Sequence, residues 1–137
     1  MKNFILIGSI LCLLFSSCET TEEMDPEEYL GTWSMTSFVN TGCRSEADNG
    51  EDERWESRSW TFNSDGTGEL VSLEYGAPEA YKYEFTYRIV GGELYTTEVD
   101  DTNEYSEGTI EVEDDQLITV YDNIITGCTE TITYIKQ

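Results

Sequence analysis

The residue types that enzymes most often use for acid–base or nucleophilic chemistry are scarce in this chain. Its 137 residues include no His and only four Cys, so the familiar pairing of a Ser or Cys nucleophile with a His base cannot form. Carboxylates are abundant, with 29 Asp and Glu, and two of them could in principle hydrolyse a glycoside. No particular pair stands out among so many. We therefore predict no catalytic residues and no enzymatic activity.

The densest group of hard metal ligands is residues 48–53, Asp-Asn-Gly-Glu-Asp-Glu. Oxygen ligands around a glycine suit calcium. The segment lacks the alternating ligand order and the distal Glu of a calcium-binding loop. We interpret it as a solvated acidic loop and predict no metal and no cofactor, with a calcium site as the alternative.

The formal net charge of −22 is the most unusual bulk property of the chain. Such a surface repels phosphate backbones and anionic head groups, so nucleic-acid binding is excluded. A hydrophobic content of 38% and an aromatic content of 12% indicate a folded domain rather than a disordered acidic chain. The charge has two interpretations, which are solubility of an exported protein and attraction of a cationic partner.

The N-terminus has the pattern of an export signal. Lys2 precedes an apolar run over residues 4–15, broken only by Gly8 and Ser9, which is too short to cross a bilayer as a stable helix. We predict a signal peptide over residues 1–17. Its end, Leu-Phe-Ser-Ser-Cys at residues 14–18, resembles the bacterial lipobox, with Phe15 where a smaller aliphatic residue is usual. The resemblance implies that Cys18 is lipidated and becomes the new N-terminus, anchored to a membrane; an ordinary signal peptide with an incidental Cys is the alternative.

Residues 18–28 are predicted to form an acidic tether, since residues 19–28 contain six carboxylates and one proline and cannot form a core. The absence of Asp directly after Cys18 resembles Gram-negative lipoproteins that are sorted to the outer membrane. The acidic cluster also resembles a signal for display on the cell surface. The expected location is therefore the bacterial outer membrane, on its periplasmic or its surface face.

From Gly31 onward, apolar residues recur with a period of two, which is typical of β-strands. In residues 81–89 every odd position is aromatic or aliphatic and every even position is polar. We predict strands at residues 31–39, 57–63, 67–74, 80–90, 93–99, 105–113, 116–121 and 126–136. The expected fold of residues 29–137 is all-β, a single up-and-down antiparallel meander that closes into a barrel of about eight strands.

The predicted connections are of two kinds. Residues 63–66, 91–92 and 114–115 suit tight hairpin turns, whereas residues 40–56, 75–79, 100–104 and 122–125 form longer loops. Alternate connections of a meander lie at the same end, so the tight turns close one end and the long loops surround an open end. Eight strands leave an interior for side chains or one small ligand.

The cysteines are consistent with a closed barrel. Cys12 lies in the signal peptide and Cys18 is the predicted lipidation site, which leaves Cys43 and Cys128. These two follow the first strand and begin the last, which are neighbours in a closed antiparallel barrel. In an oxidising compartment they are expected to form a disulfide. A redox-active pair is the alternative, although no Cys-x-x-Cys motif is present.

Several short motifs carry a family resemblance. They are Gly31-Thr32-Trp33, the long first loop, and the hairpin at residues 60–68, Trp-Thr-Phe-Asn-Ser-Asp-Gly-Thr-Gly. With eight strands, they resemble the lipocalin-like lipoprotein domains of bacteria over residues 29–137. In lipocalins the Trp closes the base of the barrel beneath an Arg from the last strand, where this chain offers Lys136. Trp33 is therefore expected to pack in the core and not to contact a ligand.

The function expected is non-catalytic binding by a monomer. Carboxylates at the open end attract cationic molecules toward it. Aromatic side chains near the mouth offer apolar walls for a small apolar or cationic ligand. The expected ligand-binding residues are Trp55, Trp60, Tyr75, Tyr81 and Tyr83. The alternative for these aromatics is that they fill the barrel. A second hypothesis is an acidic protein-binding module whose rim loops recruit or block a basic protein, and a third is a structural surface component.

Overall fold

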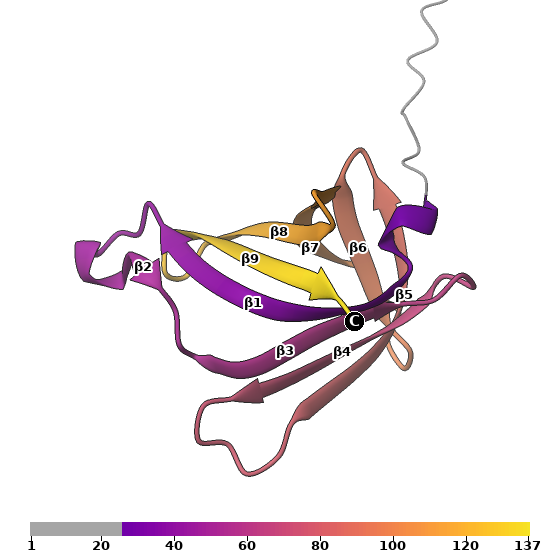
Figure 1. Cartoon of the computed structure of the whole chain (residues 1–137), viewed down its shortest axis with the longest axis horizontal. Coiled ribbons are helices and arrows are strands. Elements are labelled where there is room, and N and C mark those ends of the chain that lie inside the picture. The colour runs from indigo at the N-terminus through magenta and orange to yellow at the C-terminus, as the bar shows by residue number, and fades with distance from the viewer. Residues whose placement is uncertain (1–25) are drawn as a thin grey trace, which may run out of the picture.

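The computed structural model describes residues 26–137 (Figure 1). The predicted signal peptide, Cys18 and most of the tether lie outside these residues. The elements are η1 Pro26–Tyr29, β1 Gly31–Thr41, η2 Glu46–Asp48, β2 Gly50–Glu51, β3 Trp55–Phe62, β4 Thr67–Glu74, β5 Tyr81–Val90, β6 Glu93–Glu98, β7 Tyr105–Glu113, β8 Gln116–Asn123 and β9 Cys128–Lys136.

Eight of the strands form a closed up-and-down antiparallel barrel, as predicted. Each strand from β3 to β8 pairs with the next along the chain, and β1 pairs with both β3 and β9. The short β2 was not predicted. It pairs with the end of β1 through Val39 and Asn40. Both residues of β2 are exposed, so the segment has no hydrophobic alternation that could have revealed a strand.

The strand limits differ from the prediction mainly at the open end of the barrel. β4 and β7 have the predicted bounds, whereas β1 and β8 each continue two residues further, to Thr41 and Asn123. A bulge between Met35 and Ser37 shifts the alternation of β1 by one residue. As a result, Trp33 and Phe38, which are five positions apart, are both buried.

The two kinds of connection lie at opposite ends of the barrel. Positive φ angles at Asp114 (50°) and Asp115 (62°) are those of a tight type I′ hairpin. The chain enters the barrel at the tight-turn end, because Gly31 pairs with Phe62 beside the first tight turn. Figure 1 shows η1 and the β2-bearing loop at opposite ends. We call the end formed by the long loops the open end.

The tight-turn half of the barrel is filled by large apolar side chains. Phe62 stacks on Trp60 at 5.8 Å and meets the edge of Phe85 at 6.3 Å between ring centroids. Trp33 is 1% exposed and donates its indole N–H to the carbonyl of Tyr29 at 2.7 Å. Lys136 lies over the Trp33 ring, with its Nζ 5.1 Å from the ring centroid. Trp33 therefore packs in the core, as predicted.

Candidate functional site

A cavity of about 350 Å³ occupies the open half of the barrel interior. Its lining comes from β3 on one side and from β7, β8 and β9 on the other, so it lies inside the ring of strands. The lining residues are Arg58, Trp60, Tyr105, Ser106, Glu107, Thr119, Tyr121, Glu130 and Ile132. Its size falls within the range of small-molecule sites.

The floor of the cavity is held by a hydrogen bond between two aromatic side chains. Trp60 donates its indole N–H to the hydroxyl oxygen of Tyr134 at 3.0 Å. Tyr134 is fully buried, and burial raises the pKa of its hydroxyl. The hydroxyl therefore stays neutral and the floor carries no charge.

Arg58 supplies positive charge to the cavity. It lies on the inward face of β3 two residues before Trp60, and its guanidinium carbon is 5.4 Å from the Trp55 ring and 5.7 Å from the Trp60 ring. Its Nε is buried and has no hydrogen-bond partner within residues 26–137. None of the ion pairs in this part of the chain involves Arg58. The two indoles hold the guanidinium in place without neutralising it.

Glu107 lines the opposite wall because of a bulge in β7. The register between β6 and β7 shifts between Glu93 and Tyr95, and Gly108 has a φ of 88°, which favours glycine. The carboxylate Oε1 of Glu107 accepts a hydrogen bond from the Thr96 hydroxyl at 2.7 Å. The Tyr83 hydroxyl lies 3.1 Å from the same Thr96 oxygen. These contacts fix the position of Glu107.

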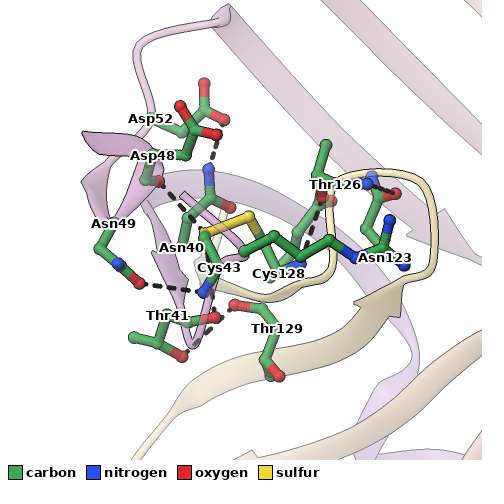
Figure 2. Close-up of a disulfide and its surroundings, with 12 residues drawn as sticks. Asn40, Thr41, Cys43, Asp48, Asn49, Asp52, Asn123, Thr126, Cys128 and Thr129 are labelled. Carbon is green, nitrogen blue, oxygen red and sulfur yellow. Dashed lines mark hydrogen bonds between the residues drawn. A yellow bond between two sulfur atoms is a disulfide. The ribbon is translucent and has the colours of Figure 1, made fainter. Parts of the chain in front are cut away.

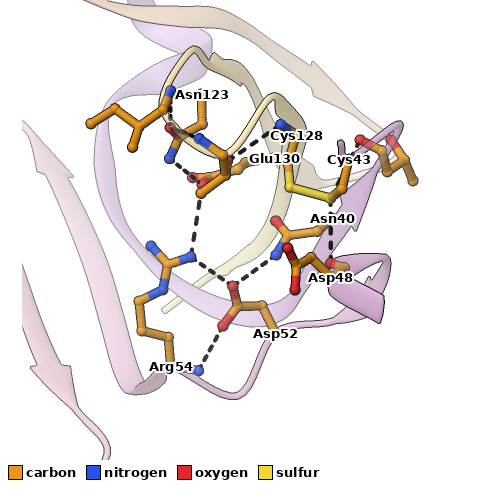
Figure 3. Close-up of polar contacts among 11 residues, drawn as sticks. Asn40, Cys43, Asp48, Asp52, Arg54, Asn123, Cys128 and Glu130 are labelled. Carbon is orange, nitrogen blue, oxygen red and sulfur yellow. Dashed lines mark hydrogen bonds and ion pairs between the residues drawn. A yellow bond between two sulfur atoms is a disulfide. The ribbon is translucent and has the colours of Figure 1, made fainter. Parts of the chain in front are cut away.

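Glu130 also lines the cavity and belongs to a polar network at the mouth (Figure 3). Its Oε1 accepts a hydrogen bond from the Asn123 amide at 2.8 Å and lies 3.8 Å from the Arg54 guanidinium. Arg54 pairs with Asp52 at 2.8 Å, and the Asn40 amide donates to the same carboxylate at 2.8 Å. The charge of Glu130 is thus partly balanced within the protein.

The pKa of Asp52 is set by opposing effects. Burial acts to raise it, but hydrogen bonds from the Arg54 backbone N–H and the Asn40 amide, together with the Arg54 charge, outweigh burial and hold the pKa below its ordinary value. Asp52 therefore remains ionised at neutral pH and ties the long first loop to β1.

The predicted disulfide joins Cys43 and Cys128, with their Cα atoms 4.0 Å apart (Figure 2). It links the loop after β1 to the start of β9 at the open end. Arg44, the next residue, donates hydrogen bonds to the carbonyls of Ile124 and Ile125 at 3.2 and 3.5 Å. The first and last loops of the barrel are thus connected covalently and by hydrogen bonds.

The five aromatic residues expected to bind a ligand have different positions. Trp60 lines the cavity, Trp55 packs over Arg58, and Tyr83 supports Glu107 through Thr96. Tyr75 and Tyr81 are 81% and 59% exposed and do not line the cavity. The cavity residues not predicted from the sequence are Arg58, Tyr105, Ser106, Glu107, Thr119, Tyr121, Glu130 and Ile132.

Several of the missed residues had a usable sequence signal, since Thr119 and Tyr121 share the parity of the buried Leu117 and Ile132 shares that of the buried Tyr134. Arg58 has the same parity as Trp60 and Phe62, so the alternation alone places it on the inward face of β3. Glu107 had none, because its inward position depends on the bulge at Gly108. No group of three or more His, Cys, Asp or Glu within residues 26–137 is arranged to hold a metal ion.

Comparison with known proteins finds no matching family model, no matching curated protein and no matching solved structure. Within the described part of the chain, no helix has the length and apolar character needed to span a membrane.

Proposed function

We propose that this protein is an extracytoplasmic, membrane-anchored lipoprotein whose barrel binds a small ligand without changing it chemically. The observation that carries the proposal is the cavity in the open half of the barrel, which has apolar walls at Trp60 and Ile132 and charged groups at Arg58 and Glu107. A concave cavity that combines aromatic and aliphatic walls with fixed polar groups is typical of ligand-binding sites. The resemblance to lipocalin-like lipoprotein domains supports the same function.

The anchor and the cavity are compatible in this arrangement. The chain enters the barrel at the tight-turn end, so an anchor at Cys18 would be joined to the end opposite the mouth of the cavity. Cell fractionation of two variants tests the anchor. Cys18→Ala should move the protein out of the membrane fraction, whereas Cys12→Ala should leave it there. Membrane retention of Cys18→Ala would contradict the anchor but would not affect the cavity.

Native mass spectrometry of the disulfide-bonded protein, isolated from the cells that produce it, tests ligand binding. A reproducible added mass that is lost on denaturation is expected. Thr119 lines the cavity, so Thr119→Phe should fill it and remove that mass. Thr131 lies on the outward face of the neighbouring strand β9, beside Val120, and Thr131→Phe should retain the mass. If the Thr119→Phe variant still carries the added mass, the ligand does not bind in the lumen, that is, in the cavity inside the barrel.

A second candidate function is binding of a basic protein by the rim. Of the nine large hydrophobic side chains that are most exposed in residues 26–137, seven lie at the open end. They are Tyr75, Tyr81, Val99, Tyr105, Tyr121, Ile124 and Ile125. Exposed acids also lie on the long loops of this end, namely Glu46, Asp48, Glu51, Glu53, Glu79, Asp100 and Asp122. Apolar anchors within an acidic rim suit a cationic, partly apolar partner.

A synthetic peptide of alternating lysine and leucine is a suitable probe for the rim. Ile124→Ser should weaken its binding more than Ile135→Ser, an exposed apolar residue at the tight-turn end. Binding should also fall steeply with salt. Equal effects of the two substitutions would count against the rim as a binding surface.

A further inference from the structure

Two opposite charges face each other across the cavity without forming an ion pair. In the cyclic order of the eight barrel strands, β3 and β7 are diametrically opposite, and they carry Arg58 and Glu107. No ion pair within residues 26–137 includes either residue. We propose that the cavity binds a small aminocarboxylate zwitterion, with its carboxylate on Arg58 and its ammonium group on Glu107. This inference rests on the proposed function and names the class of its ligand.

Arg58, the cationic group of the site, differs from the other basic residues of the described chain in its surroundings. Arg54, Lys82 and Arg88 form ion pairs, Arg44 donates to backbone carbonyls, and Lys136 lies over Trp33. Arg58 lines a cavity instead, with a buried and unpartnered Nε. A planar guanidinium presents a fork of N–H donors that matches a carboxylate.

The anionic half of the site is equally specific. Thr96 donates to one oxygen of Glu107, which orients the carboxylate without neutralising its charge. Glu130 is the other carboxylate of the lining. It already accepts a hydrogen bond from the Asn123 amide and lies near the Arg54 guanidinium. Within residues 26–137, Glu107 is thus the cavity carboxylate that forms no ion pair, and an ammonium group of a ligand would supply one.

Electrostatics decides between a zwitterion and a singly charged ligand. A cation would satisfy Glu107 but leave Arg58 unpaired, and an anion would do the reverse while also approaching a protein of net charge −22. A zwitterion satisfies both groups and carries no net charge, so the field of the whole protein does not oppose it. Its apolar part would contact Trp60 and Ile132, which line the same cavity.

The test uses three compounds with one aromatic skeleton and calorimetric titration of the full-length, disulfide-bonded protein. Phenylalanine carries both charges, phenethylamine lacks the carboxylate, and 3-phenylpropionate lacks the ammonium group. A fourth compound, 4-(aminomethyl)benzoate, is a zwitterion with more widely separated charges. We expect at least one zwitterion to bind tenfold or more tightly than both singly charged compounds.

Two substitutions assign the charges. Arg58→Gln should abolish the preference for phenylalanine over phenethylamine, and Glu107→Gln should abolish the preference over 3-phenylpropionate. If 4-(aminomethyl)benzoate binds more tightly than phenylalanine, each of the two variants should weaken its binding tenfold or more.

Arg88→Gln and Glu104→Gln are matched controls, since this exposed ion pair lies outside the cavity, and they should leave all affinities unchanged. Thermal unfolding checks that each variant is folded, and Arg58→Lys, which keeps the charge without the fork, should bind with intermediate affinity.

The outcomes separate the inference from the proposed function. If singly charged compounds bind as tightly as the zwitterions, or if both cavity variants keep the preferences, the zwitterion site is overturned while binding in the lumen stands. A retained native ligand without an amine and a carboxylate would have the same consequence. If no compound binds and native mass spectrometry gives only the mass of the protein, the proposed function fails as well.

Discussion

At the scale of single residues, the polar side chains of the open half have two different roles. Asp52 is held by Asn40 and Arg54, so its charge stabilises the long first loop. Arg58 has no such partner within residues 26–137 and is available to a ligand. This contrast is why we assign a structural role to Asp52 and a binding role to Arg58.

The lowered pKa of Asp52 predicts a specific dependence of stability on pH. Because the folded pKa lies below the unfolded value, the stabilisation is present above about pH 4 and is lost as the pH falls through the folded pKa. Asp52→Asn should lower the free energy of unfolding by roughly 1–2 kcal/mol at pH 7. The difference from wild type in urea titrations should shrink toward pH 3, and a difference independent of pH would refute this role.

At the scale of elements, the sequence predicts the strands well and their irregularities poorly. Alternation and turn residues identify all eight barrel strands, and the connection lengths distinguish the two ends. The bulges near Met35 and Gly108 are set by pairing with strands distant in sequence, so no local pattern reveals them. Glu107 was missed for this reason. Arg58 was missed because a charged residue is expected on the outer face even where parity places it inside.

The bulge at Gly108 should be intolerant of substitution. A Cβ atom there would lie 2.1 Å from the backbone oxygen of Val120, in addition to the cost of a side chain at positive φ. Gly108→Ala should therefore destabilise the fold by about 2–3 kcal/mol in urea unfolding and displace Glu107.

Gly76→Ala is the matched control for this prediction. Gly76 also has a positive φ, of 79°, but a Cβ atom there would have open space. Its cost should be only about 1 kcal/mol. Equal costs for the two substitutions would show that the close approach of β7 to β8 is not what requires glycine at Gly108.

At the scale of the whole molecule, closure of the barrel brings together residues far apart in sequence. Cys43 and Cys128 are separated by 85 positions, and their pairing was predictable because the first and last strands of a closed barrel are neighbours. The contents of the cavity were less predictable, since they depend on which side chains meet across the barrel. The exposed positions of Tyr75 and Tyr81 likewise depend on how far each loop extends beyond the strands.

Removal of the disulfide should lower stability substantially. Closing a loop of this length contributes roughly 4.5 kcal/mol in the chain-entropy model. The double variant Cys43→Ser with Cys128→Ser should therefore lose up to about that amount in urea unfolding. Wild-type protein under reducing conditions should lose a similar amount. A loss under about 1 kcal/mol would show that the β1–β9 pairing alone holds the open end.

The most direct test of ligand binding in the lumen uses the three tryptophans of the chain as reporters in NMR. Trp60 lines the cavity, Trp55 packs over Arg58, and Trp33 lies beneath Lys136 at the tight-turn end. Addition of phenylalanine or 4-(aminomethyl)benzoate should shift the indole N–H signal of Trp60 and leave that of Trp33 unchanged. Unchanged Trp60 and Trp55 signals at saturating concentrations of both compounds, or equal shifts of all three signals, would contradict binding of this ligand class in the lumen.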